Sequence, residues 1–280
     1  MKILLFGKTG QVARELCNRP NVSAMGRDKA DFTEPEKIIE IVKSTNADII
    51  INAAAYTAVD LAEDEFQLAS IINGTTVTEI AKVAAKRHIP FLHISTDYVF
   101  KGDGNLSWKT NDQTNPQNSY GKSKLIGERG IIKAGGPHVI LRTSWVFSAH
   151  GDNFVKTILR LASKNHELNI VNDQIGGPTC ANDIADALWK IASDFYAGNG
   201  ITGIYHFSGK PNSSWAYFAS EIFAQTKQDI TIKQISTTNF LTKVERPLNS
   251  RLDCSSLKID YGIDQPKWKK GLTNVLANLK

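Results

Sequence analysis

Tyr120 and Lys124, four positions apart, are the residues of this chain best suited to acid–base chemistry. Residues at this spacing lie on one face of a helix. A lysine ammonium beside a phenol favours the phenolate, so we expect Lys124 to lower the pKa of Tyr120 from its usual value of about 10. Thr96 brings a hydroxyl that can polarise a carbonyl. Such a trio suits proton transfer to a carbonyl oxygen during hydride transfer from a nicotinamide.

The N-terminus carries the pattern of a dinucleotide-binding turn. An apolar run of strand length, 2–6, precedes a turn that begins at Gly7 and leads into a helix. Gly7 permits the tight turn, Gly10 lets the backbone approach a pyrophosphate, and the small Ala13 lets the helix pack close to the sheet. The pyrophosphate would lie on free N–H groups at the helix N-terminus. The alternative is a strand, turn and helix with glycines that serve the turn alone.

Composition favours an ordinary globular protein. The chain has 280 residues, 41% of them hydrophobic and 22% charged, and a net charge of +5. No block of basic residues indicates nucleic-acid binding, and no apolar run is long enough to span a membrane. Three cysteines, far apart and odd in number, predict a reducing compartment without disulfides. We therefore expect a cytoplasmic protein.

Strand and helix patterns alternate through the first half of the chain. This alternation predicts an α/β fold with a Rossmann-type, doubly wound parallel sheet and a smaller C-terminal substrate-binding region. We expect a dinucleotide-binding domain over 1–145, and over 146–280 a mixed region that completes the sheet and forms a cap on the substrate. The predicted strands are 2–6, 21–25, 48–51, 91–94, 139–141, 168–171 and 204–207, and the main predicted helices are 35–42, 75–87, 120–133, 154–162, 184–192 and 214–224.

Three polar or small clusters directly follow predicted strands, at 52–55, 95–97 and 142–145. Ligands of open α/β sheets bind at the carboxyl ends of the strands. We therefore expect the three clusters to converge on one rim.

Seven sequence blocks occur in an order that covers nearly the whole chain. Together they resemble the dTDP-4-dehydrorhamnose reductase family of the extended short-chain dehydrogenase/reductase superfamily. The blocks start at Gly7, Asn52, Ser95, Tyr120, Arg142, Asp173 and Arg246.

The resemblance implies that a reduced nicotinamide delivers hydride to the C4 keto carbon of dTDP-4-dehydro-L-rhamnose, giving dTDP-L-rhamnose. It implies that Tyr120 donates the proton, that Lys124 tunes Tyr120 and holds the nicotinamide ribose, and that Thr96 hydrogen-bonds the reacting oxygen. The implied cofactor-binding residues are Gly7, Gly10, Gln11, Val12, Asp31, Phe32, Ala55, Tyr56, Thr57, Tyr120 and Lys124. The implied substrate-binding residues are Thr96, Asp97, Trp145, Arg246 and Arg251.

These roles have structural alternatives. Tyr120 and Lys124 could be an exposed helix pair, and Thr96 and Asp97 could cap a turn. Trp145 could be a core aromatic. The two arginines of the last block could be solvated, or could bind a diphosphate in a bidentate manner.

The cofactor and metal are less sharply indicated. Arg27 after the second strand suits a 2′-phosphate, so we expect NADPH with NADH also used, although Asp28 lies next to it.

Some relatives bind magnesium at a dimer interface. Glu15 matches one ligand, but Asn182 stands where an acid is expected, so magnesium is doubtful. The six histidines show no zinc-ligand spacing. The resemblance also implies a homodimer as the candidate assembly.

Two other functions stay open at this point. The chain could be a nucleotide-sugar 4-epimerase or dehydratase of the same superfamily, enzymes that usually retain NAD. It could also be a non-catalytic relative that resembles the regulatory subunit of methionine adenosyltransferase.

Overall fold

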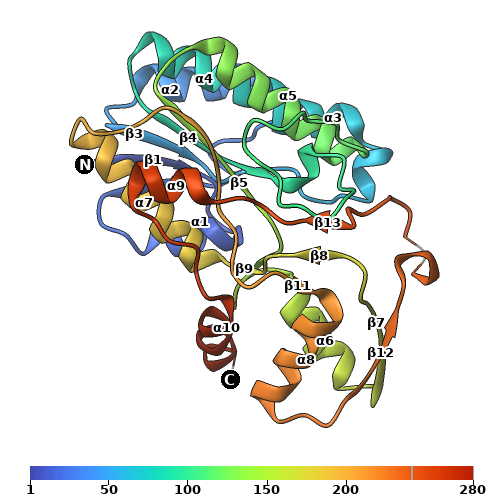
Figure 1. The fold of residues 1–280 in the computed structure, drawn as a ribbon. Coiled ribbons are helices and arrows are strands. Elements are labelled where there is room, and N and C mark those ends of the chain that lie inside the picture. The colour runs from blue at the N-terminus through green and yellow to red at the C-terminus, as the bar shows by residue number, and fades with distance from the viewer. Residues whose placement is uncertain (241, 280) are drawn as a thin grey trace.

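A parallel six-stranded sheet runs through the molecule in the order β10-β5-β4-β3-β1-β2 (Figure 1). The computed structural model describes residues 1–240 and 242–279. Neighbouring strands are parallel throughout this sheet. The predicted doubly wound sheet is therefore confirmed. Its strands are β1 (Ile3–Phe6), β2 (Val22–Met25), β3 (Ile49–Asn52), β4 (Phe91–Thr96), β5 (His138–Thr143) and β10 (Gly203–His206).

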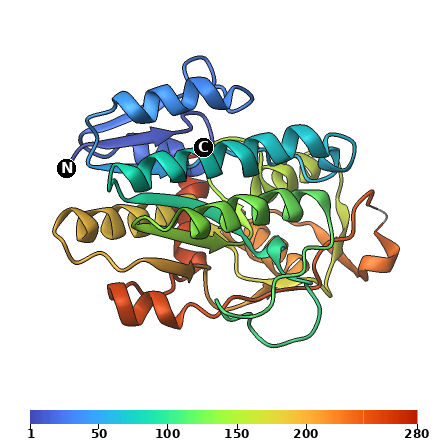
Figure 2. The ribbon, with the colours of Figure 1, turned by 90° about the horizontal axis from the view of Figure 1, so that it is seen from above.

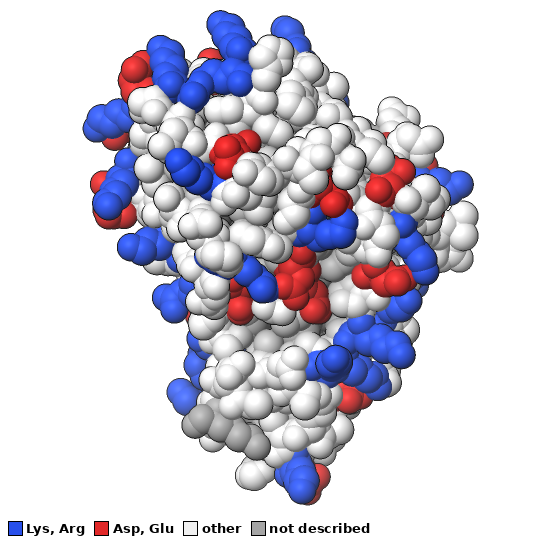
Figure 3. All heavy atoms as spheres, turned by 90° about the vertical axis from the view of Figure 1, so that its left-hand side faces the viewer, with Lys and Arg blue, Asp and Glu red and all other residues white. Residues whose placement is uncertain are grey.

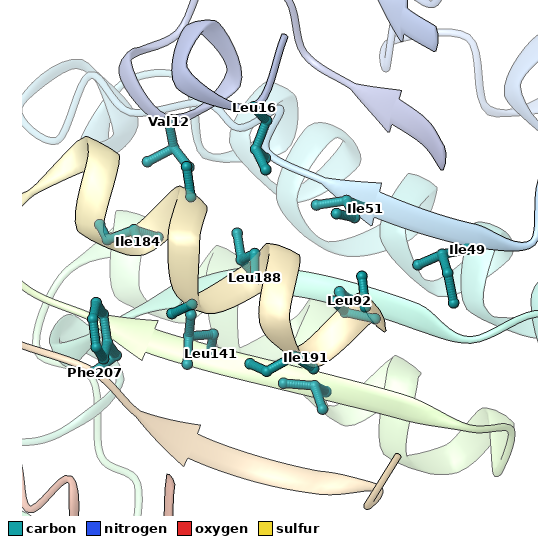
Figure 4. Packing of buried hydrophobic residues seen from close by; sticks show 14 of the residues in the cluster. Val12, Leu16, Ile49, Ile51, Leu92, Leu141, Ile184, Leu188, Ile191 and Phe207 are labelled. Atoms are coloured by element: carbon teal, nitrogen blue, oxygen red, sulfur yellow. The ribbon is translucent and has the colours of Figure 1, made fainter. Parts of the chain in front are cut away.

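Helices cover both faces of the sheet, which explains the continuous apolar runs of its central strands. On one face lie α1 (Gln11–Cys17) and α7 (Ala181–Tyr196), whose apolar side chains pack against β3, β4 and β5 (Figure 4). The other face carries α2 (Pro35–Ser44), α4 (Thr76–Lys86) and α5 (Ser119–Ala134). Seen from above, α4 and α5 run side by side along the sheet (Figure 2).

The direction of strand addition reverses at β1. The chain passes from β1 to β2 on one side and then returns to β3 on the other side. In open α/β sheets a ligand crevice opens at such a point. Gly7 lies at this point of the chain, directly after β1, and its backbone has a φ of +103°. A Cβ on residue 7 would lie 3.1 Å from the backbone of Ala53. The position therefore requires glycine.

The second half of the chain completes the sheet and builds a smaller lobe. The lobe has its own apolar core and lies below the sheet in Figure 1. A boundary at 145/146 stays a prediction. The lobe contains α6 (Phe154–Ala162), β7 (Glu167–Val171), α8 (Trp215–Thr226), β12 (Thr231–Ile235) and α10 (Trp268–Ala277).

Short elements connect the two parts. They include η1 (Leu61–Glu63), α3 (Phe66–Ser70), the π-helical η2 (Ile71–Thr75), η3 (Asp97–Val99), β6 (Val146–Phe147), β8 (Ile175–Gly176), β9 (Thr179–Cys180), β11 (Ser213–Ser214), η4 (Thr237–Asn239), β13 (Asn249–Ser250) and α9 (Ser255–Tyr261).

Two strands are longer than predicted at their carboxyl ends. β4 continues through Ser95 and Thr96, and β5 continues through Thr143. Their hydroxyl side chains interrupt the apolar pattern that marked the strands, although the ladder continues with Thr96 opposite Thr143. Two of the predicted clusters thus begin as the last residues of strands, with 95 and 96 in β4 and 142 and 143 in β5. The helix predicted over 75–87 is also preceded by α3 and η2, which place Asn73 near α5.

Charges of both signs intermingle on the face shown in Figure 3. No helix within the described residues is long and apolar enough to cross a membrane.

A buried ion pair ties β5 to α5. Arg142 reaches Glu128 through two hydrogen bonds, Nε to Oε1 at 3.0 Å and Nη2 to Oε2 at 2.6 Å, and both side chains are at most 3% exposed. The guanidinium also lies 4.9 Å from the ring centroid of Phe100. The pair therefore joins the strand that ends in Thr143 to the helix that carries Tyr120.

Glu128→Gln should destabilise the fold by about 3–5 kcal/mol, because it leaves the buried guanidinium without a counter-charge. Urea unfolding checks this value. The matched control is Glu34→Gln, which breaks the exposed pair with Lys37 and should cost less than about 1 kcal/mol. Equal losses in the two variants would contradict the assignment.

Candidate active site

A cavity of about 640 Å³ opens at the carboxyl edge of the sheet, within the size range of small-molecule sites. Residues from all three predicted clusters meet there, together with the glycine turn and the start of α5. The three clusters therefore converge as expected. The lining residues are Gly10, Gln11, Val12, Ala53, Ala54, Ala55, Thr57, Val59, Ile94, Ser95, Thr96, Asp97, Tyr98, Tyr120, Lys124, Thr143, Ser144, Trp145, Val146, Gly151 and Asp152.

The first turn of α5 sets the position of Tyr120. Asn118 caps the helix by accepting from the Gly121 N–H at 2.8 Å, and Ser119 donates to Glu63 from its N–H and its hydroxyl. A Cβ at Gly121 would overlap the Tyr98 carbonyl oxygen. Because residue 121 is glycine, α5 begins directly against η3, and the Tyr98 and Tyr120 rings meet edge to face at 5.6 Å.

The pKa of Tyr120 is shifted in the direction opposite to the one expected from Lys124. Burial, and then the charge of Asp97, raise the pKa of the Tyr120 phenol above its ordinary value, while the Thr96 hydroxyl opposes them. The prediction that Lys124 lowers the pKa of Tyr120 is therefore wrong for this geometry. The physical reason is that burial of the ring outweighs the hydrogen bond to the phenolate.

Lys124 is almost completely buried, which excludes the alternative of an exposed helix pair. Its Nζ donates to the Ile94 carbonyl at 2.7 Å and lies 3.1 Å from His93 Nε2. Burial lowers the pKa of Lys124 to about 8, although the nearby Glu128 carboxylate opposes this shift. The lysine is therefore held by β4 and can exchange a proton near neutral pH.

Thr96 caps η3, Asp97 is the first residue of that helix, and both line the cavity. The Tyr98 N–H donates to Thr96 Oγ1 at 3.2 Å, and the Thr96 hydroxyl contacts Asp97 Oδ1 at the same distance. Burial raises the pKa of Asp97 to about 6, although hydrogen bonds from Ser250 and Thr96 oppose the shift. The second carboxylate oxygen of Asp97 is buried without a partner among the described residues, as are the hydroxyls of Ser95 and Thr143.

These three unpaired groups lie together on the lining of one cavity. Buried polar groups are rarely left unpaired, so this end of the cavity is suited to a ligand rich in hydroxyl or carbonyl groups.

The opposite end of the cavity is formed by backbone and small side chains. Gly10 is the N-cap of α1, and no described side chain caps this helix. Gln11 Oε1 accepts from Ser148 at 3.0 Å and from Asn153 at 3.1 Å, which ties the turn to the start of α6. Backbone N–H groups and small residues are what a dinucleotide pyrophosphate requires.

Trp145 has a strained backbone, with a φ of +49° that bulky residues rarely adopt. Its ring stacks on Trp215 with centroids 3.5 Å apart. A Cβ at Gly176 would lie 2.7 Å from the ring, so a glycine is needed beside it. Since Trp145 lines the cavity and is only half-buried, it is not simply a core aromatic. Strain of this kind is concentrated at functional sites.

Several of the predicted cofactor-binding residues do not line the cavity. Tyr56 lies just behind the wall, where Asn73 pairs with its backbone and Glu65 accepts from its hydroxyl at 2.7 Å. Asp31 accepts from Thr33, and Phe32 packs edge to face on Phe6 in the core. Gly7 lies in the turn between β1 and α1 and does not line the cavity. Their roles in binding stay predictions.

The two arginines predicted to bind a diphosphate also lie outside the large cavity. Arg246 pairs with Asp60 at 2.6 Å and lines a neighbouring pocket with Tyr98. Arg251 donates to Asn249 Oδ1 at 2.9 Å. Both are half-buried rather than freely solvated.

Glu15 lies in another pocket, 3.7 Å from His150 and together with Asn182 and Asp183. No group of three histidine, cysteine or carboxylate side chains placed to hold a metal occurs among residues 1–240 and 242–279. The role of Glu15 therefore remains untested. The three cysteines carry free thiols.

Several polar residues support the site although the sequence analysis assigned them no individual role. Ser95, Thr143 and Tyr98 line the cavity, and His93 and Asn52 lie behind Lys124. Their signal was position, since each lies within or beside a cluster at the end of a strand.

Comparisons with known proteins identify the family. A family model described as the RmlD substrate binding domain matches residues 1–280. The chain is 41% identical to the dTDP-4-dehydrorhamnose reductase of Sinorhizobium fredii, over 96% of this chain and 95% of the relative. It is 38% identical to the enzyme of that name from Escherichia coli K12, over 100% of this chain and 98% of the relative.

Solved structures give the same result. A dTDP-4-dehydrorhamnose reductase from Bacillus anthracis in complex with NADP matches with a TM-score of 0.92 and 32% identity, covering 99% of both chains. An ortholog from Clostridium acetobutylicum matches with a TM-score of 0.93 and 33% identity, covering 100% of this chain and 99% of that one. The chain therefore belongs to the RmlD family, the family of the dTDP-4-dehydrorhamnose reductases.

Proposed function

We propose that this chain reduces the C4 keto group of dTDP-4-dehydro-L-rhamnose to give dTDP-L-rhamnose, with NADPH as the preferred cofactor. The observation that carries the proposal is the convergence of Thr96, Tyr120 and Lys124 on one cavity whose other end is an uncapped glycine turn. Family membership gives independent support.

The residues present fit a dinucleotide. Gly10, Gln11 and Val12 would hold the pyrophosphate through backbone N–H groups, and Ala53–Ala55 leave room beside them. When bound, the cofactor supplies the hydride. Lys124 would hold the nicotinamide ribose.

Arg27 is the residue we assign to the adenosine 2′-phosphate. It follows β2, is exposed, and pairs with Asp31 at 3.0 Å. An exposed pair of this kind contributes little, so Arg27 can exchange the carboxylate for a phosphate. NADP in the Bacillus anthracis relative supports this preference, and NADH would be the weaker donor.

The reacting carbonyl would lie against Thr96, whose hydroxyl polarises it, and Tyr120 would donate its proton to the developing alkoxide. The high pKa of Tyr120 keeps its proton in place until then. Asp97 and Trp145 would contact the sugar. Arg246 and Arg251 are proposed for the diphosphate, with Arg246 released from Asp60.

The other functions have less support. A UDP-glucose 4-epimerase matches with a TM-score of 0.81 but at 15% identity, which supports the fold alone. A buried Lys124 and hydroxyl groups left free for a ligand are unnecessary in a purely regulatory relative. The proposal includes a homodimer, and three free thiols support a cytoplasmic location.

The direct test follows loss of reduced-nicotinamide absorbance with dTDP-4-dehydro-L-rhamnose generated in situ. We expect oxidation that depends on the keto sugar, is faster with NADPH than with NADH, and yields dTDP-L-rhamnose. Bound NAD in the purified protein would favour an epimerase. Co-purification with methionine adenosyltransferase and no oxidation with either cofactor would favour the regulatory role.

Tyr120→Phe should lower kcat by at least about 100-fold, because it removes the proton donor. The affinity for NADPH, measured by fluorescence titration, should stay nearly unchanged. Tyr205→Phe is the control, because the hydroxyl of Tyr205 donates to Asp260 at 2.8 Å and does not line the cavity. Near-normal turnover of Tyr120→Phe would show that another group donates the proton.

Asp97 should make stability fall as pH rises from about 4 to about 6. Burial raises the pKa of this carboxyl from 3.8 to about 6, so in this window the folded state keeps a proton that the unfolded state has lost. Two pKa units correspond to a free energy on the order of 3 kcal/mol. Asp97→Asn should lose this part of the pH dependence, as measured by urea unfolding at several pH values. If the free energy of unfolding of the unsubstituted protein and of Asp97→Asn depended on pH in the same way, a group other than Asp97 would cause the pH dependence.

A further inference from the structure

A buried polar chain lies behind Lys124 and has no role in the reaction described so far. His93 Nε2 lies 3.1 Å from Lys124 Nζ, and His93 Nδ1 lies 3.0 Å from Asn52 Nδ2. His93 is 0% exposed and Asn52 is 1% exposed. Neither residue lines the cavity, so ligand contact does not explain them.

The orientation of the Asn52 amide follows from its other contact. The Ala54 backbone N–H donates to Asn52 Oδ1 at 3.0 Å. A backbone N–H is always a donor, so the amide oxygen must face it and the NH₂ group must face His93. Because the NH₂ group can only donate, Nδ1 of His93 is the acceptor and carries no proton.

The proton of His93 is therefore on Nε2. Burial holds the pKa of His93 well below its ordinary value, so the imidazole is neutral and has one N–H. That N–H points at Lys124 Nζ. An ammonium has only donors and would oppose it, whereas a neutral amine accepts from Nε2 and still donates to the Ile94 carbonyl at 2.7 Å. Every partner is satisfied only when the amine is neutral.

We propose that Asn52 and His93 are positioning residues that hold the imidazole proton on Nε2, stabilise the neutral amine of Lys124, and so prepare this lysine to release a proton. In its catalytic part the proposal rests on the reductase function proposed above. In this cycle Lys124 starts as the ammonium. As the alkoxide takes the Tyr120 proton, one N–H bond of the ammonium breaks, and the proton released restores the phenol. The amine that remains accepts from His93, and water returns its proton before the next turnover.

The charged groups around His93 and Lys124 do not cancel the stabilisation of the neutral amine. On α5, Glu128 favours the ammonium, but both of its oxygens are bonded to Arg142 of β5. Tyr120 lies on the same helix and keeps its proton. At the end of β4, Asp97 is bonded to Thr96. From β3 the group facing His93 is the uncharged amide of Asn52.

The first test reads the tautomer directly and needs no turnover. Nitrogen-15 NMR of labelled histidines in the full chain separates a protonated from a bare ring nitrogen, and His93→Gln identifies the signal among the six histidines. We expect His93 to be protonated on Nε2 and bare on Nδ1 from pH 6 to 9. A proton on Nδ1, or on both nitrogens, would overturn the proposal whatever sugar the enzyme reduces.

The second test uses the sign of a pH shift. His93→Leu removes the N–H that opposes the ammonium, so the alkaline limb of kcat should move upward by about one pH unit, the value of one hydrogen bond. A bare Nε2 that accepts from the ammonium would give a downward shift instead. A downward shift or none contradicts the proposal. The control is His138→Leu, which removes a buried imidazole bonded to Gly136 and should leave the limb in place.

Discussion

The site depends on how closely α5 approaches the turn after β4. Gly121 makes this possible, because a Cβ there would overlap the Tyr98 carbonyl. Gly127 and Gly130 let the same helix lie against η2 and α4, where a Cβ would overlap the Asn73 carbonyl or the Thr78 side chain. Glycine inside a helix costs about 1 kcal/mol relative to alanine. At Gly121 the close approach that offsets this cost puts Tyr120 beside Thr96 and Asp97, and at Gly127 and Gly130 it holds α5 against η2 and α4. Lys124 then reaches the β4 backbone from the next turn.

Polar burial is the second feature of the site. Lys124, His93, Asp97 and Arg142 are buried in the region where the strands end, although such groups are normally exposed. Arg142 is fully paired, whereas Asp97 retains an oxygen without a described partner. The paired groups hold the framework, and the unpaired ones are left for a ligand. Stability is lower for this arrangement, which is common where geometry serves chemistry.

The fold by itself says little about the reaction. An epimerase of different activity shares it at 15% identity. The distinguishing features are local: the strained Trp145 beside Gly176, the bond from Arg246 to Asp60, and the three hydroxyl or carboxylate oxygens that face the cavity. Function therefore follows from the site and from family membership rather than from the parallel sheet.

The sequence alone was sufficient for the parallel sheet, the glycine turn and the meeting of three clusters at one edge. These follow from local periodicity and from the rule that parallel strands end at a common rim. Only the tertiary structure decided the electrostatics. Whether Lys124 lowers the pKa of Tyr120 depends on burial and on which atoms its amine meets, and these are His93 and the Ile94 carbonyl. Such contacts join residues about thirty positions apart, so no local pattern predicts them.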